Sequence, residues 1–179
     1  MRITSPLMAS MAMLGLGAPM TSALGPEAAA SAKTTVLLAG TLSITVPASA
    51  SLGIASSGNT ITNLLGTVTV IDGRSGSKSW TATVSATNFT ASGGNTIAKA
   101  NVSYWSGPVT VAVGTGIRNP GQPTAAGRVS LAVPVTAFTG SKTSLVASTT
   151  TGWKPTLVVS VPGTATARTY TGTITHSVA

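Results

Sequence analysis

The chain has 179 residues, with 10 Lys and Arg against only two Asp and Glu, one His and no Cys. Such a composition excludes disulfides and leaves too few carboxylate and histidine ligands for most hydrolytic or metal chemistry. Its 20 Gly and 10 Pro fall short of the content of low-complexity disorder. We therefore expect a basic, folded protein that is stabilised by packing and backbone hydrogen bonds.

Residues 1–32 have the layout of a secretory signal peptide. A basic start at Arg2 precedes an apolar run over residues 7–16, and residues 30–32 (Ala-Ser-Ala) form a small-residue cleavage signal. The apolar run is shorter than the ~20 residues that span a membrane. A disordered or membrane-anchored N-terminus is the alternative. We expect cleavage after Ala32, which leaves a secreted single domain of residues 33–179, long enough to bury a core.

The charge of the exported part is almost entirely positive. Cleavage would remove Arg2 and Glu27 and leave Asp72 as the only acidic residue. A chain this basic is attracted to anionic surfaces such as nucleic acid, acidic lipid or phosphate-bearing wall polymers. The Lys and Arg residues are scattered singly, however, and form no run typical of a nucleic-acid-binding arm. They could also serve only to keep the protein soluble.

Alternation of apolar and polar residues recurs along the whole exported part, which is typical of half-buried strands. Clusters of Gly, Pro, Asn and Asp separate these segments and indicate turns. We expect eight or nine short strands, no helix, and an all-β fold that is an antiparallel β-sandwich or a small barrel. The longest non-strand connections are expected at residues 114–126 and 145–154. The alternating segments are residues 42–46, 68–70, 80–84, 102–104, 109–113, 129–135, 157–161 and 170–178.

Few combinations of residues could carry chemistry. Glycoside hydrolysis in its usual form needs two carboxylates, and the exported part has one. A zinc site needs three or four ligands, and Asp72 and His176 are too few. No G-x-S-x-G motif marks a nucleophilic serine. The sequence therefore predicts a protein that is not an enzyme and that has no metal and no cofactor.

Five stretches occur in an order and spacing that resemble a known family: LSITVPASASLG, LGTVTVIDGRSGSKSWTATVSATNFT, TIAKANVSYWSG, WKPTLVVSVPG and YTGTITHSVA. Together they look like the WxL-type cell-surface domain, in the secreted single-domain form of Gram-positive bacteria of the actinobacterial kind. The resemblance runs from about Leu42 to Val178. It implies export, a largely β fold and non-covalent attachment to the cell wall, with peptidoglycan as the proposed ligand.

The two Trp-any-Leu motifs that name the family are altered here. Trp80-Thr81-Ala82 stands at the first and His176-Ser177-Val178 at the second. Strand parity places both motifs on the face of their apolar neighbours. We expect Trp80, Ala82, His176 and Val178 to be structural. His176 is expected to fill an aromatic-sized, partly buried position near a frayed C-terminus, and a functional histidine is the alternative.

The best candidates for ligand binding lie elsewhere. Trp105 shares a strand face with Ser103 and Asn101, which suggests an exposed indole, although it could instead fold over its own turn as a lid on the core. Arg74 and Lys78 lie close together in a loop. The binding hypothesis takes Trp105 for the sugar rings and the two cations for wall phosphates, and assumes that both regions share one end of the sandwich.

Three functions are compatible with these observations. The first is a secreted, non-enzymatic cell-surface module that associates non-covalently with peptidoglycan or anionic wall polymers, or with other surface proteins. The second is a structural subunit, a homo-oligomer whose edge strands pair between copies to build an extracellular fibre or layer. The third is an antimicrobial or nucleic-acid-binding protein driven by charge alone, without sequence-specific recognition of nucleic acid. None of the three requires a transmembrane segment.

Overall fold

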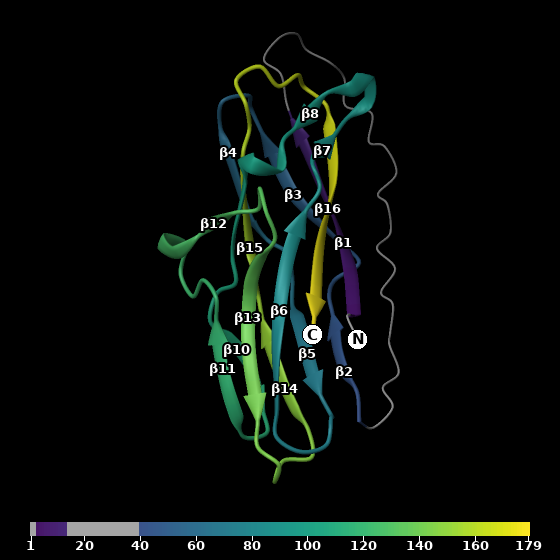
Figure 1. The fold of residues 1–179 in the computed structure, drawn as a ribbon. Helices are drawn as coiled ribbons and strands as arrows, with labels where there is room; N and C mark the ends of the chain where they lie inside the picture. The colour runs from purple at the N-terminus through teal and green to yellow at the C-terminus, as the bar shows by residue number, and fades with distance from the viewer. Residues whose placement is uncertain (1–2, 14–39) are drawn as a thin grey trace.

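The computed structural model describes residues 3–13 and 40–179, and almost all regular structure in them is strand. Figure 1 shows an elongated molecule whose longer strands run roughly along one axis. Besides the strands there are three single-turn 3-10 segments: Ser92–Gly94, Lys99–Asn101 and Ala125–Gly127. No helix in these two ranges is long and apolar enough to cross a membrane. The predicted all-β fold is confirmed.

One layer of the sandwich is an eight-stranded sheet with a main path of six strands, and a short pair lies off this path. In this sheet β6 is an inner strand that pairs antiparallel with β13 on one side and with β16 on the other. The strands of the path, in spatial order, are β11 (Gly116–Pro120), β13 (Val135–Lys142), β6 (Lys78–Ala86), β16 (Thr169–Val178), β1 (Ile3–Met13) and β3 (Ser49–Ala55). The pair comprises β7 (Phe89–Thr90), beside β16, and β8 (Thr96–Ile97).

The second layer consists of two four-stranded sheets whose strands alternate along the chain. The first has the order β10 (Val109–Val113), β14 (Thr149–Trp153), β5 (Val68–Asp72) and β2 (Leu42–Thr45). The second has the order β12 (Val129–Ser130), β9 (Val102–Trp105), β15 (Thr156–Ser160) and β4 (Thr60–Leu64). Three segments continue from one sheet into the other, namely β4 to β5, β9 to β10 and β14 to β15. The two sheets are therefore one layer that is interrupted across its middle.

Proline and glycine account for the interruption. Pro155 lies between β14 and β15, and Gly107-Pro108 lies between β9 and β10. Proline has no N–H to donate to a ladder, and Gly107 adopts a positive φ of 73°. The carbonyl of Pro155 still accepts a hydrogen bond from the Leu65 amide at 2.9 Å, which ties the break to the neighbouring segment.

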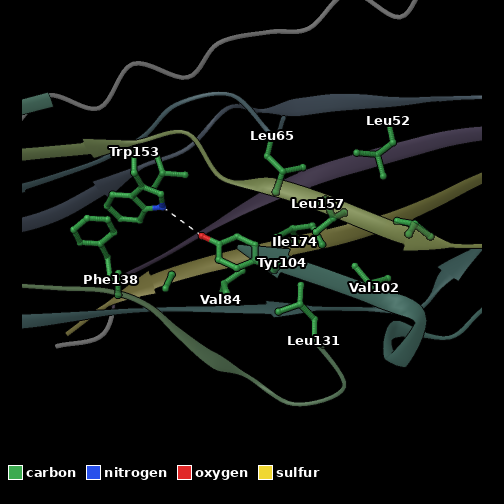
Figure 2. Close-up of a cluster of buried hydrophobic side chains, with 14 of the residues drawn as sticks. Leu52, Leu65, Val84, Val102, Tyr104, Leu131, Phe138, Trp153, Leu157 and Ile174 are labelled. Atoms are coloured by element: carbon green, nitrogen blue, oxygen red, sulfur yellow. Dashed lines mark hydrogen bonds between the residues drawn. The ribbon is translucent and has the colours of Figure 1, made fainter. Parts of the chain in front are cut away.

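The core fills the space between the layers and is built around aromatic side chains. Phe138 of the large sheet stacks on Trp153 of the second layer, with ring centroids 4.7 Å apart. The Trp153 Nε1–H donates to the Tyr104 hydroxyl at 3.3 Å, the bond dashed in Figure 2. Almost fully buried aliphatic side chains surround this group, namely Leu52, Leu65, Leu131, Leu157 and Ile174 (Figure 2). Both layers thus contribute to one hydrophobic core.

Several expectations about local structure were wrong. The predicted loop over residues 114–126 contains β11, and the predicted loop over residues 145–154 contains β14. The expected single strand over residues 129–135 is divided between β12 and the start of β13. The C-terminus is not frayed, since Ala179 exchanges two backbone hydrogen bonds with Thr81, at 2.9 and 3.1 Å. More strands form than the eight or nine expected.

The N-terminal strand β1 lies between β16 and β3. It pairs antiparallel with β16, from Ile3 opposite Val178 to Ala12 opposite Thr169. It pairs in parallel with β3, from Met8 opposite Ser49 to Met13 opposite Ala55. These residues fall within the predicted signal peptide, and the cleavage site after Ala32 lies outside the described residues. Cleavage there stays a prediction.

Candidate functional site

The turn between β5 and β6 holds the ion pair of Arg74 and Asp72. Asp72 is fully buried, and its carboxylate accepts hydrogen bonds from Arg74 Nε at 2.9 Å, Arg74 Nη2 at 3.0 Å and the Arg74 amide at 3.1 Å. Arg74 Nη2 also donates to the Ser79 carbonyl at 2.8 Å. A two-point pairing of this kind is the strongest that Arg forms. Arg74 therefore neutralises the buried acid and braces the turn.

Electrostatics at this turn follow from the pairing. Burial alone would raise the pKa of the Asp72 carboxyl, but the hydrogen bonds and charge of Arg74, with the nearby charge of Lys142, hold that pKa below its usual range. The side-chain hydrogen bond to Asp72 also raises the pKa of Arg74. Asp72 is thus an anion at neutral pH. Its charge neutralises that of Arg74, which weakens the attraction of Arg74 for an anionic ligand.

Lys142, which the sequence did not single out, is a buried cation beside this turn. It ends β13 directly opposite Lys78 in β6, and its Nζ donates to the carbonyls of Val146 at 2.9 Å and Ala147 at 3.3 Å. Lys142 and Gly73 line a surface depression of about 440 Å³. Lys78 itself is exposed, and among the described residues its side chain forms no ion pair. Of the two predicted cations, Lys78 is the more exposed, because Arg74 is largely engaged by Asp72 and the Ser79 carbonyl.

Trp105 occupies the last position of β9 and is half-buried. Strand parity was right about the direction, because Val102 and Tyr104 are fully buried while Ser103 and Trp105 are not. Immediately after it, buried Ser106 donates from Oγ to the Gln122 carbonyl at 2.9 Å and accepts from the Gln122 amide at 3.1 Å. Because Trp105 is only half-exposed, it is less accessible than the sequence predicts.

The structure does not bring Trp105 together with Arg74 and Lys78. Along β14, Thr149 lies opposite Asp72 and Trp153 lies opposite Val109, which follows Trp105 by four residues. The four residue steps from Thr149 to Trp153 separate the two levels by about 13 Å of strand. The assumption that Trp105 and the β5–β6 turn share one end of the sandwich is therefore wrong, because β10 leads away from Trp105 toward that turn.

The four motif positions lie side by side in neighbouring strands. Val178 of β16 pairs directly with Ala82 of β6, and His176 pairs with Val84. All of them are buried, and Trp80 of the same face is 3% exposed. The Trp80 indole lies against Gly140 in the paired strand, where a Cβ would collide with the ring. Trp80, Ala82 and Val178 are buried as predicted, and His176 is fully rather than partly buried. Parity alone could not show that the two motifs meet.

His176 belongs to a buried aromatic network. Its Nε2 lies 3.2 Å from the Tyr104 hydroxyl, which also accepts the Trp153 Nε1–H. Because Trp153 can only donate, the Tyr104 hydroxyl is free to donate to a neutral His176. Burial lowers the pKa of His176 to about 3 and raises that of Tyr104. His176 Nδ1 is buried without a partner. This group holds the layers together and has no access to solvent.

A second feature that the sequence did not single out is an apolar rim on two edge strands. β10 and β11 are consecutive in the chain but lie at the edges of different sheets. Val111, Val113 and Ile117 are exposed there, with 59% of Val113 and 61% of Ile117 accessible. Arg118 fixes the connection, because its Nη2 donates to the Val113 carbonyl at 2.6 Å and the Gly114 carbonyl at 2.7 Å. The alternation over residues 109–113 predicted this strand but not its exposed position.

Within residues 3–13 and 40–179, no three His, Cys, Asp or Glu side chains gather into a possible metal site. The single carboxylate side chain of that part, Asp72, is committed to Arg74. Comparisons with known protein families, curated proteins and solved structures found no match. The resemblance to the WxL-type domain therefore stays a prediction, and the function has to be argued from the surface.

Proposed function

We propose that this protein is a secreted, non-catalytic cell-surface module that associates non-covalently with anionic polymers of the cell wall. One observation carries the proposal: in the described part, the only acidic side chain is buried and ion-paired, so every charged side chain on the surface is a cation. An unopposed positive surface attracts a polyanion whatever its detailed structure. Resemblance to the WxL-type domain supports the same partner.

The exposed cations are distributed over the molecule. Lys78 lies at the β5–β6 turn, Arg128 follows the third 3-10 turn, Lys154 lies between β14 and β15, and Arg168 precedes β16. All four are exposed. A scattered set of charges fits an extended, flexible polyanion better than a small ligand held in one pocket. Attraction of this kind is screened by salt, with a Debye length of about 10 Å at 0.1 M.

Retention on purified walls tests the proposal. We expect the protein to bind walls at 50 mM salt, to be released at 500 mM, and to bind poorly to walls from which the phosphate polymers have been extracted. A variant with Lys78, Arg128, Lys154 and Arg168 all changed to Gln should lose most of the salt-sensitive retention. Lys78→Arg with Lys154→Arg is the charge-preserving control and should bind as the parent does.

Equal retention on extracted walls, or full retention of the Gln variant, would exclude anionic polymers as the partner. Duplex DNA at the same salt is the second control. Binding to DNA with the same affinity as to the wall polymer would favour a general charge-driven binder over a wall module, because nonspecific DNA binding depends on the same released counterions.

A second candidate function is that of a structural subunit, and the apolar rim of β10 and β11 favours it. Edge strands with exposed Val111, Val113 and Ile117 are ready templates for pairing with another copy. Val111→Lys with Val113→Lys should prevent such pairing, since edge lysines are how natural sheets avoid it. Sedimentation of the exported protein with and without these changes tests this candidate.

A further inference from the structure

β1 is the strand that joins β3 to the rest of the large sheet. β16 has other partners, since it pairs with β6 over Ile174–Val178 and with Thr90 of β7. β3 has no other sheet partner among the described strands. Without β1, β16 and β3 would stand two strand spacings apart, about 9.5 Å, with both facing backbone edges unpaired. Cleavage after Ala32 would therefore leave a strand-wide slot inside the sheet.

The slot lies next to the core. On β16, alternate residues from Tyr170 through Ile174 to Val178 are buried, and Leu52 of β3 is 2% exposed. An unfilled slot would expose a long row of unpaired amides and carbonyls beside this apolar interior. Open edges of this kind recruit another strand, either from the same chain or from a second one. The exported protein thus needs a strand to replace β1.

We propose that the slot accepts residues 33–39 of a second copy of this chain. The inference deepens the second candidate function and rests on the predicted cleavage after Ala32. The segment reads Lys-Thr-Thr-Val-Leu-Leu-Ala, with a run of strand-forming apolar residues. Seven extended residues reach about 24 Å, enough to cover most of the ten β16 residues that β1 pairs with. Val36 and Leu38, two residues apart, match the inward period of β16.

The direction of the strands favours a second copy over the same copy. β1 runs antiparallel to β16 and parallel to β3. In Figure 1, β2 and β1 both run upward, and the chain enters β2 at its lower end. A strand in the slot that continued directly into β2 of the same chain would therefore have to run opposite to β1 (Figure 1). A second copy has no such constraint and can insert its segment in the direction of β1.

The exported protein and a synthetic peptide test this. Sedimentation of secreted protein, with its N-terminus established by mass spectrometry, should show concentration-dependent assembly. A peptide of the sequence of residues 3–13 should bind one per chain and dissociate the assemblies, because its pairing with both neighbours is known. A control peptide with Met8→Pro and Ser10→Pro should bind at least tenfold more weakly, since proline cannot donate to the ladder.

Two matched variants test the donor segment. Leu38→Asp should raise the dissociation constant of the assembly at least tenfold, whereas Leu37→Asp, on the opposite strand face, should change it little. Equal effects of the two variants would overturn strand insertion. A monomer at every concentration, no binding of the peptide, or retention of residues 1–32 in the secreted protein would also overturn it. Wall retention, measured on the same samples, should be unchanged in Leu38→Asp, which separates this inference from wall association.

Discussion

Replacing His176 by Phe should remove most of the pH dependence of stability between neutral pH and pH 5. His176 is fully buried, and burial lowers its pKa from an ordinary 6.5 to about 3. The unfolded chain therefore binds a proton in this range that the folded protein resists. Stability contributed by the neutral imidazole is fully present above pH 6.5 and is lost progressively as the pH falls toward 3.

The magnitude follows from the two pKa values. One pKa unit corresponds to 1.36 kcal/mol, so lowering the pH from 7 to 5 should reduce the free energy of unfolding by about 2 kcal/mol in the parent. At pH 7 the substitution itself should change stability by less than ~1 kcal/mol. It removes the unpartnered Nδ1 of His176, but it also removes the acceptor of the Tyr104 hydroxyl, and these two effects oppose each other.

Urea unfolding of both proteins at pH 7, 6 and 5 is the assay. His176 is the only histidine, and Asp72 stays charged throughout this range because its pKa is held low, so the difference between the proteins isolates one group. The parent should lose about 2 kcal/mol and His176→Phe much less. Parallel curves for the two proteins would refute the buried, neutral imidazole and with it the packing described around Tyr104 and Trp153.

Three further predictions concern stability, each measured by urea unfolding at pH 7. Arg74→Ala should lower the free energy of unfolding by about 3 kcal/mol because it leaves a buried carboxylate unpaired. Lys78→Ala should change it by no more than about 0.5 kcal/mol. Similar losses in the two variants would mean that the ion pair is not structural. Gly140→Ala should cost about 1–3 kcal/mol because its Cβ meets the facing indole, and a neutral result would contradict that contact. Trp153→Ala should lower the free energy of unfolding by about 4 kcal/mol and Trp105→Ala by less than about 2 kcal/mol. The salt-sensitive wall retention of Trp105→Ala should be unchanged.

Strand parity predicted the faces of the strands well. It placed Trp80 and Ala82 with the core, Tyr104 inward and Trp105 outward, and His176 among buried residues, and the structure agrees on each. These assignments succeed because side chains alternate across any strand regardless of its partners. Parity therefore needs only a few consecutive residues.

Strands without apolar alternation were missed. β14 reads Thr-Thr-Thr-Gly-Trp and is buried through its threonines, and β11 contains Arg118, Asn119 and a terminal proline at a sheet edge. Pairing partners far apart in sequence were equally invisible, such as Val178 with Ala82. The assumption about Trp105 and the basic turn failed for the same reason, because it depends on how three strands are ordered in space.

The fate of Asp72 shows another limit of the sequence. As the only acid of residues 33–179, directly before Gly73, it is predicted by the sequence to be a turn residue on the surface. It is buried instead, since Arg74 two residues later reaches back to both carboxylate oxygens. Because of that local pairing, the charged side chains on the described surface are all cationic.

Fractionation of an exporting culture tests the central claim most directly. The protein should be found in the wall fraction, should be released by raising the salt from 50 to 500 mM, and should remain bound in buffer of low ionic strength. Quantitative recovery in the culture medium at low salt, or retention on the wall that salt does not affect, would contradict association through an unopposed positive surface.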